Sequence, residues 1–508
     1  MEISLANIAI GKVDFIEQYA LWSVEQRDAV HRIIKKIEEN KLELVRVSVA
    51  DQHGILRNKT LTTRAFKSAL CNGVDFTVAP FVFDTANSIV FDPFVDGGGF
   101  GRPEMSGLPD VVLVPDPLTF RILPWVPATG WILGDLYFNS GKPLPWAPRG
   151  LMQKALDALK KQGFGYVAGL EVEWYLTKLE ETILDPDQLG GPGKPPPPPR
   201  VRPVTRGYQY LMEAHLDEID GILQILRQHL EGVGLPLRTM EDEWGPGQLE
   251  FTFDPLPELE AADAMMLLRS AVKQICRRHG YHATFMCKPG IPSFFASGWH
   301  LHQSLINLDT KLNAFTSRQP DQAISGVGRH FMGGLLAHAG AACVFTTPTI
   351  NGYKRAKPFS LAPDRATWGI ENRGAMLRVQ GGLNDLAAHI ENRIGEPAAN
   401  PYLYMAAQIF AGLDGIERQL DPGLPSEAPY AAIDKPLLPK TLIEATALLK
   451  QDELLRRSFG DEFIDYIVKI KEFEWDRFVK YLESAGISAE NATDTVTDWE
   501  QREYFELY

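Results

Sequence analysis

The sequence has few cysteines, an excess of acidic over basic residues, and no long apolar run. Four cysteines are scattered over 508 residues without a CxxC pair, which argues against a disulfide framework and fits a reduced, cytoplasmic protein. The 51 Lys and Arg residues against 65 Asp and Glu residues give a net charge of −14. A non-specific nucleic-acid binder needs a basic face, so we expect no nucleic-acid partner.

Membrane and secretory signals are also missing. The most apolar stretch, residues 333–345, is too short to cross a bilayer. The N-terminal segment has no cationic start followed by an apolar core, so we expect no signal peptide and no membrane span.

Length and local patterns predict two α+β domains. The chain is too long for one ordinary domain. Residues 24–41 have helical apolar spacing, and residues 42–61 alternate about a Gly turn, which predicts a β-hairpin. From Pro148 onward, helical and strand patterns alternate, and the last ninety residues are mostly helical. We therefore predict domains at residues 1–143 and 144–508.

One low-complexity insert, residues 185–203, interrupts the second domain. Its five consecutive prolines force an extended polyproline conformation, and they lack the N–H groups that a central strand needs. Its GPGK sequence is no phosphate-binding loop, because Gln188 stands where the first Gly is needed and Pro195 replaces the Ser or Thr. We expect a surface loop.

Polar residues spaced two apart inside strand-like segments are the most informative pattern. Such residues share one face of a strand, as Glu171 and Glu173 do in GLEVEWYL. The same reading applies to QLEFTF, GWHLHQSL and AHIENRI. For one strand a solvated face is the simpler interpretation, but four such strands predict a shared cavity. Its ligands would be Glu171, Glu173, Glu243, Glu250, Glu391 and His300, an oxygen-rich set that favours Mg²⁺ or Mn²⁺.

A second group of residues is cationic. Arg355, Arg373, Arg378 and Arg393 lie in NGYKRAKP, ENRGAMLRV and IENRI, and Lys354 precedes the first of them. Each alone is explained by a surface ion pair. Together with divalent metals, arginines favour phosphoryl transfer, because its transition state requires charge neutralisation.

These motifs, in this order, resemble the glutamine synthetase superfamily, namely bacterial type I enzymes and the related γ-glutamyl-amine ligases. The resemblance extends over GLEVEWYL, EWGPGQLEFTF, GWHLHQSL, PTINGYKRAKP, WGIENRGAMLRV and IENRIGEPAANPYLYMAAQIFAGLDGI. It implies an N-terminal β-grasp domain and a catalytic domain with a curved antiparallel sheet flanked by helices. It also implies homo-oligomeric double rings of ten or twelve subunits.

The resemblance assigns roles to individual residues. It makes Glu173, Glu243 and Glu250 the ligands of one metal, and Glu171, His300 and Glu391 those of a metal bridging the ATP phosphates. It further implies that His302, Ser304 and Arg378 bind the nucleotide. Arg373 and Arg378 would act in catalysis at the phosphate, and Arg355 and Arg393 would bind glutamate. The implied reaction forms γ-glutamyl phosphate from L-glutamate and ATP, and an amine then displaces phosphate.

The sequence departs from ammonia-using members of this family at three places. Leu361 occupies the position of a loop Glu that takes a proton from ammonium, although Asp364 lies nearby. VDFTVAP stands where an ammonium-binding Asp is expected. Phe295 and Ala296 replace a small Asn-Gly segment, and Trp299 replaces a Met. Each change removes charge or adds apolar bulk, so we expect Leu361 and Trp299 to line an apolar amine pocket.

We therefore predict a ligase for an apolar amine in amine catabolism. An arylamine such as aniline is neutral at pH 7 and needs no base before it attacks, whereas an alkylamine is protonated. A short alkylamine is the second choice and a polyamine the third. Two alternatives remain open: a true glutamine synthetase using ammonia, and a non-catalytic ring-forming homologue.

Overall fold

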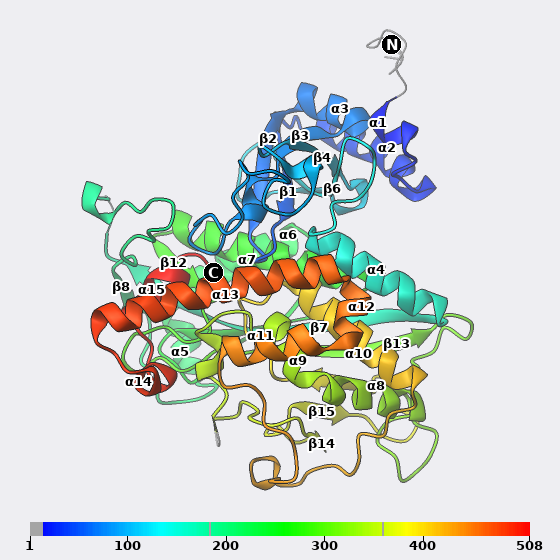
Figure 1. Cartoon of the computed structure of the whole chain (residues 1–508), viewed down its shortest axis with the longest axis vertical. Coiled ribbons are helices and arrows are strands. Elements are labelled where there is room, and N and C mark those ends of the chain that lie inside the picture. The colour runs from blue at the N-terminus through cyan, green and yellow to red at the C-terminus, as the bar shows by residue number, and fades with distance from the viewer. Residues whose placement is uncertain (1–13, 182–183, 358–359) are drawn as a thin grey trace.

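The structure, a computed structural model, describes residues 14–181, 184–357 and 360–508. Two sheets organise these residues, one built from residues 44–137 and one from residues 164–392. Figure 1 shows the smaller N-terminal unit at the top and the larger, helix-rich unit below it. The predicted α+β class is confirmed. The proposed domain boundary at residue 143 falls in the connection between the two sheets.

The N-terminal sheet has the strand order β2-β1-β6-β4-β3, with β5 paired to β6. The predicted hairpin is present, since β1 and β2 pair antiparallel from Leu44 opposite Thr62 to Ala50 opposite Leu56. Strands β1 and β6 run parallel at the centre. The elements are α1 (Phe15–Gln18), α2 (Val24–Glu39), β1 (Leu44–Ala50), β2 (Leu56–Thr62), α3 (Thr63–Asn72), β3 (Val74–Thr77), β4 (Asp110–Pro115), β5 (Arg121–Ile122) and β6 (Thr129–Tyr137).

Helix α2 illustrates how the sequence forms these elements. Ser23 and Gln26 make a reciprocal capping box that satisfies backbone N–H groups at the helix start. Ala29, Ile33 and Ile37 then recur at helical spacing and are buried. The apolar stripe and the cap therefore act together to place this helix.

The second sheet has ten strands, with β14-β15-β16-β13-β7-β10-β9 as its main order. All pairs are antiparallel except β14 with β15. The long strand β7 lies at its centre and also pairs with β8, β11 and β12. The strands are β7 (Phe164–Leu179), β8 (Val201–Pro203), β9 (Leu237–Asp242), β10 (Gln248–Phe253), β11 (Leu256–Pro257), β12 (Tyr281–Thr284), β13 (Trp299–Asn307), β14 (Trp368–Ile370), β15 (Leu377–Gln380) and β16 (His389–Asn392).

The proline-rich insert is not a loop throughout. Residues 201–203 form β8, which pairs with residues 177–179 at the end of β7. Proline is tolerated there because a short flanking strand needs few donors. The prolines at 195–199 form no helix or strand, in agreement with the prediction.

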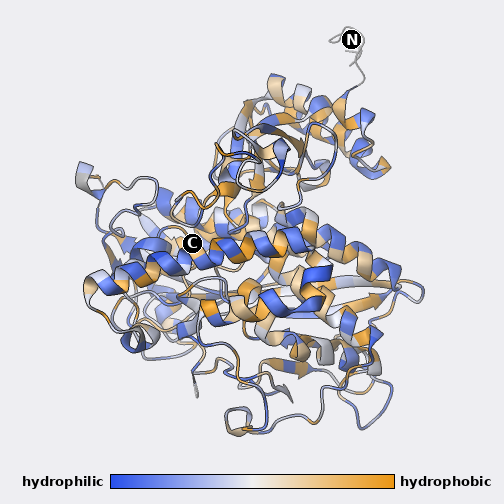
Figure 2. Cartoon of the chain, viewed as in Figure 1, coloured by the Kyte–Doolittle hydropathy of each residue, from blue (hydrophilic) through white to orange (hydrophobic). Residues whose placement is uncertain are grey.

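Helices pack on the second sheet and against one another. They are α4 (Pro148–Lys161), α5 (Glu213–Glu218), α6 (Asp220–Gly232), α7 (Leu259–Arg278), α8 (Gly326–Ala337), α9 (Ala339–Thr346), α10 (Pro401–Glu417), α11 (Leu442–Gln451), α12 (Glu453–Phe459), α13 (Asp461–Ala485), α14 (Ala489–Asp494) and α15 (Asp498–Tyr504). Helix α10 is buried along most of its length, whereas α4 and α13 carry both hydrophilic and hydrophobic residues in Figure 2. None of the helices in the described residues is both long and apolar enough to cross a membrane.

Buried polar contacts join the two units. Arg149 of α4 pairs with Asp116 and Asp135 of the N-terminal unit and with Asp263 of α7, at 2.7, 2.9 and 3.0 Å. The Arg269 guanidinium donates to the Gly54 carbonyl at 2.9 Å. Because Arg149 and Arg269 are buried, removing either cation from the joined units would leave its partners without a donor.

Candidate active site

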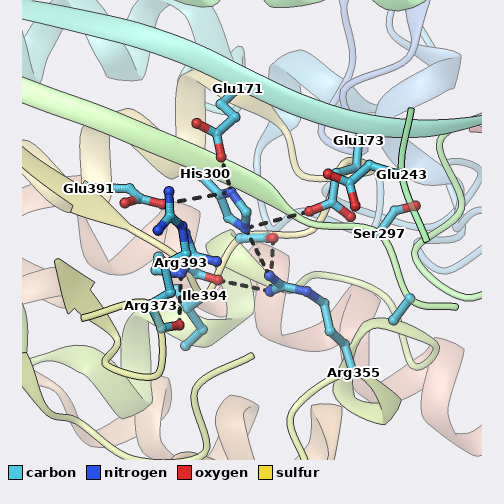
Figure 3. A network of polar contacts seen from close by, with 12 residues as sticks. Glu171, Glu173, Glu243, Ser297, His300, Arg355, Arg373, Glu391, Arg393 and Ile394 are labelled. Atoms are coloured by element: carbon cyan, nitrogen blue, oxygen red, sulfur yellow. Dashed lines mark hydrogen bonds and ion pairs between the residues drawn. The ribbon is translucent and has the colours of Figure 1, made fainter. Parts of the chain in front are cut away.

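Four strands of the second sheet bring the predicted polar residues together. Glu171 and Glu173 lie on β7, Glu250 on β10 and His300 on β13, and Glu391 lies on β16. Register places Glu171 opposite His300 and Glu173 opposite Glu250. Figure 3 shows His300 at the centre, with Glu173 and Glu243 to one side and Glu391 to the other. The convergence predicted from alternate residues is present.

His300 contacts carboxylates on both sides. Its Nδ1 hydrogen-bonds to Glu171 and lies 3.7 Å from Glu391, and its Nε2 lies 3.7 Å from Glu173. His302 reaches the same Glu171 carboxylate through Nε2 at 3.0 Å. Both imidazoles thus point into the acidic cluster, as expected for two residues on one face of a strand.

The carboxylates do not share one electrostatic environment. Burial and the charge of Glu173 raise the pKa of Glu243 to about 8, and burial with the charges of Glu171 and Glu173 raises that of Glu250 to about 11. Burial opposes ionisation of Glu171 and Glu391 as well. Their pKa values are nevertheless lowered, by His300 beside Glu171 and by Arg393 beside Glu391. On the side of Glu243 and Glu250, burial and the neighbouring carboxylates therefore disfavour ionisation, and an added cation is needed to hold these groups in the charged form.

This donor set fits divalent metal ions. Among the described residues, two groups bring ligand atoms close enough to share an ion: Glu171, Glu250 and His300, and Glu171, His302 and Glu391. Carboxylate oxygens with few imidazoles favour Mg²⁺ or Mn²⁺. The groups differ from the sets that the resemblance implied, because His302, expected at the nucleotide, lies with Glu171 and Glu391. Glu173 and Glu243 lie beside the cluster.

Three of the predicted arginines form a connected layer next to His300. The Arg355 guanidinium donates to the Arg393 carbonyl at 2.9 Å and contacts His300 Nε2 at 3.2 Å. The Arg393 Nε donates to the Arg373 carbonyl at 3.1 Å, and its guanidinium pairs with Glu391. The Arg373 side chain is exposed. Figure 3 shows these cations on the side of His300 away from Glu171.

Arg378 and Lys354 have different surroundings. Arg378, on β15, is held between Glu391 at 3.0 Å and Glu371 at 2.5 Å. Lys354 is buried in an ion pair with Glu500 near the C-terminus. Lys354 therefore supports the structure and does not belong to the cationic layer of the site.

A cavity of about 470 Å³ adjoins the cluster. His302, Ser304 and Glu171 line it from β13 and β7, with Arg238 and His389 on other walls. The His389 Nε2 lies 3.0 Å from the His302 Nδ1, so this second imidazole orients the first. The cavity lies at the positions that the resemblance assigned to the nucleotide.

Trp299 does not line the site, contrary to expectation. Its side chain is fully buried, and its ring meets Tyr404 of α10 edge-on with centroids 5.0 Å apart. The reason is strand alternation, because the residue before His300 points to the opposite face of β13. Leu361 is 51% exposed, with a backbone φ of 59°.

Sequence reasoning missed several residues at the site. The Gln248 amide donates to the Glu173 carboxylate at 3.1 Å and to the Ser297 hydroxyl at 3.0 Å. Gln248 lies two residues before Glu250, so the rule of alternate residues would have found it. Tyr210 gave no comparable signal. Tyr210 stacks on Trp244, the residue after Glu243, and burial and the charges of Glu243 and Glu250 raise the pKa of Tyr210 to about 12.

Comparisons with known proteins agree with this geometry. Residues 145–490 match the glutamine synthetase catalytic domain. The chain is 51% identical to a γ-glutamylanilide synthase of Acinetobacter sp over 98% of its length and 99% of the relative. It is 31% identical to a glutamate–isopropylamine ligase of Pseudomonas sp, covering 89% of this chain and 95% of that one.

A solved structure of a GmaS/ADP complex superposes with a TM-score of 0.73 at 27% identity, over 92% of this chain and 98% of that one. The acidic cluster, the arginine layer and these matches lead to one conclusion: the chain belongs to the glutamine synthetase family.

Proposed function

We propose that the protein joins the γ-carboxyl group of L-glutamate to an aromatic amine with cleavage of ATP to ADP and phosphate. The observation that carries this proposal is the 51% identity to a γ-glutamylanilide synthase along almost the whole chain. Leu361 at the position of a proton-accepting Glu supports it, because an arylamine is neutral at pH 7 and needs no such base.

The reaction has two steps. A γ-carboxylate oxygen of glutamate attacks the γ-phosphorus of ATP, and the bond to the leaving ADP breaks. The amine nitrogen then attacks the acyl carbon of γ-glutamyl phosphate, phosphate leaves with the bonding electrons, and the nitrogen loses a proton to solvent.

The chain's own residues account for charge and position in these steps. Arg355 and Arg393, linked through the Arg393 carbonyl, would hold the glutamate carboxylate, and Arg373 and Arg378 would neutralise charge on the transferred phosphoryl group. Divalent ions held by Glu171, Glu250, His300, His302 and Glu391, with Glu173 and Glu243 alongside, would supply charge neutralisation of the phosphates. His302 and Ser304 line the cavity that would accept the nucleotide.

The test is phosphate release that depends on both glutamate and ATP, measured with Mg²⁺ over a panel of amines. We expect kcat/KM to rank aniline above isopropylamine, and isopropylamine above putrescine and ammonia. A preference for ammonia would identify a true glutamine synthetase, and absence of turnover with every amine would identify a non-catalytic homologue.

Two further expectations accompany this function. We propose that the enzyme is cytoplasmic and acts first in the breakdown of the amine. We also propose that it assembles into a double ring of ten or twelve subunits, which light scattering and electron microscopy would test.

A further inference from the structure

Exposed aromatic side chains concentrate beside one end of the acidic cluster. Among the described residues, the exposed aromatic side chains are Phe94 in the N-terminal unit and Tyr208, Tyr210, Trp244 and Phe295 in the larger unit. Trp244 directly follows Glu243, and the Tyr208 backbone N–H donates to the Trp244 carbonyl at 3.3 Å. Exposing several large rings in one place is costly for a folded protein unless the rings bind something.

Two of these rings form a preorganised flat surface. Tyr210 and Trp244 stack with centroids 5.2 Å apart and an angle of 5° between their planes, and their exposed fractions are 45% and 42%. The Trp244 backbone N–H donates to the Glu243 carboxylate at 3.3 Å. The stacked pair is therefore attached to a carboxylate of the site.

Phe295 lies on a second loop, which Tyr175 fixes to β7. Tyr175 of β7 holds its backbone on both sides: the hydroxyl accepts from the Phe295 N–H at 2.7 Å and donates to the Phe295 carbonyl at 3.1 Å. The ring of Tyr175 stacks on Phe294 with centroids 4.3 Å apart. The side chain of Phe295 remains 51% exposed.

One side chain connects the two loops. The side-chain oxygen Oε1 of Gln248 accepts from the N–H of Gly245, the residue after Trp244, at 2.9 Å. Its amide nitrogen donates to Glu173 and to Ser297, two residues after Phe295. Gln248 thus holds the Trp244 loop on one side and the Phe295 loop on the other, close to Glu173.

We propose that Trp244, Tyr210 and Phe295 form the binding mouth for the ring of the amine substrate, with its amino group directed to Glu173 and Glu243. We call these three residues the aromatic mouth. This inference rests on the function proposed above and specifies which residues select an aromatic amine. Planar rings stack on Trp and Tyr in offset or edge-on geometry, whereas an alkyl group or ammonia gains little from such a surface.

The test compares variants of the full chain with aniline and with isopropylamine. Trp244→Ala and Phe295→Ala should raise the KM for aniline about tenfold, and should raise the KM for isopropylamine much less. The KM values for glutamate and ATP should change less than twofold. Tyr210→Ala should resemble Trp244→Ala, and Tyr210→Phe, which keeps the stacked ring, should raise the KM for aniline less than Tyr210→Ala does. Leu448→Ala is the matched control, since Leu448 is 46% exposed on α11.

The outcomes separate this proposal from the proposed function. If the wild type uses aniline and the mouth variants keep its KM, the aromatic mouth is wrong and the function stands. If the wild type uses only ammonia, the function is wrong. Competitive inhibition by aniline then tests the aromatic mouth separately. Weaker inhibition of Trp244→Ala than of the wild type supports the mouth, and equal inhibition of both proteins, or no inhibition, overturns it. Loss of assembly in Trp244→Ala, seen by light scattering, would show a subunit contact and would also overturn it.

Discussion

Glu173 and Glu250 stand directly opposite each other on the antiparallel strands β7 and β10. Like charges in this position destabilise a sheet by up to about 1 kcal/mol. Burial adds to this cost, and Glu171 and Glu243 bring further negative charge. A cation-binding site at this pair explains why the sheet keeps an arrangement that lowers its stability.

We expect metal ions to stabilise the protein through this pair. Saturating Mg²⁺ or Mn²⁺ should raise the midpoint of thermal unfolding, because a ligand at a hundred times its Kd adds about 2.7 kcal/mol. Glu250→Gln should stabilise the metal-free protein by about 1 kcal/mol and reduce the metal-induced shift. Differential scanning fluorimetry with and without EDTA measures both effects.

Glu231→Gln is the control for that experiment, because Glu231 lies in an exposed helix pair with Arg227. It should leave the metal-induced shift unchanged. An equal shift in wild type and Glu250→Gln would show that the ion binds elsewhere.

Restoring a carboxylate at residue 361 should improve the use of ammonia. A positioned base accelerates proton removal, so Leu361→Glu should raise kcat/KM for ammonia about tenfold, with little gain for aniline, which is already neutral. Leu361→Gln has nearly the same shape but cannot accept a proton. Steady-state assays of both variants measure this difference. Equal values of kcat/KM for ammonia in Leu361→Glu and Leu361→Gln would contradict a role for the base.

The local patterns of the sequence were enough to find the strands of the site, but not their partners. Alternation along β7 and β13 identifies Glu171, Glu173 and His300, because which face a side chain takes depends only on its own strand. The same rule, applied to Trp299, would have excluded it from the pocket. Pairing between strands depends on packing over long sequence distances, so the regrouping of His302 with Glu171 and Glu391 was not predictable.

Side-chain contacts between different segments of the chain were the least predictable part. Gln248 carries a detectable signal, since it precedes Glu250 by two residues on the same strand. The ion pair of Arg378 with Glu371 carries none, because nothing in the spacing of the two residues indicates that β15 brings them together. The stacking of Tyr210 on Trp244 joins residues thirty-four positions apart, and no periodicity connects them.

The buried Arg149 should be essential for joining the two units. Replacing it with Ala leaves the carboxylates of Asp116, Asp135 and Asp263 without their shared cation. Removing one partner of a buried ion pair costs about 3–5 kcal/mol, so the urea midpoint should fall strongly. Arg227→Ala, which breaks an exposed helix pair, should cost less than about 1 kcal/mol. Similar losses in the two variants would show that the buried cluster contributes no more than a surface pair.

His338 should make stability depend on pH. It lies between Asp452 at 2.7 Å and Asp414 at 3.1 Å. Burial lowers the pKa of this imidazole, but the hydrogen bonds and charges of the two carboxylates outweigh burial, and the net pKa is raised above 6.5. The folded state thus binds the proton more tightly. The resulting stabilisation is complete below pH 6.5 and is lost as the pH rises through the pKa of the folded protein.

Asp452→Asn isolates this effect. Asp452 also caps α12 by accepting from the Leu455 N–H, and Asn caps a helix equally well, so the helix should persist. The variant should lose more unfolding free energy relative to wild type at pH 6 than at pH 9, because only the protonated imidazole gains from the carboxylate charge. Urea unfolding at the two pH values measures the difference. A deficit of the same size at both would mean that Asp452 acts through its hydrogen bonds alone and not through its charge.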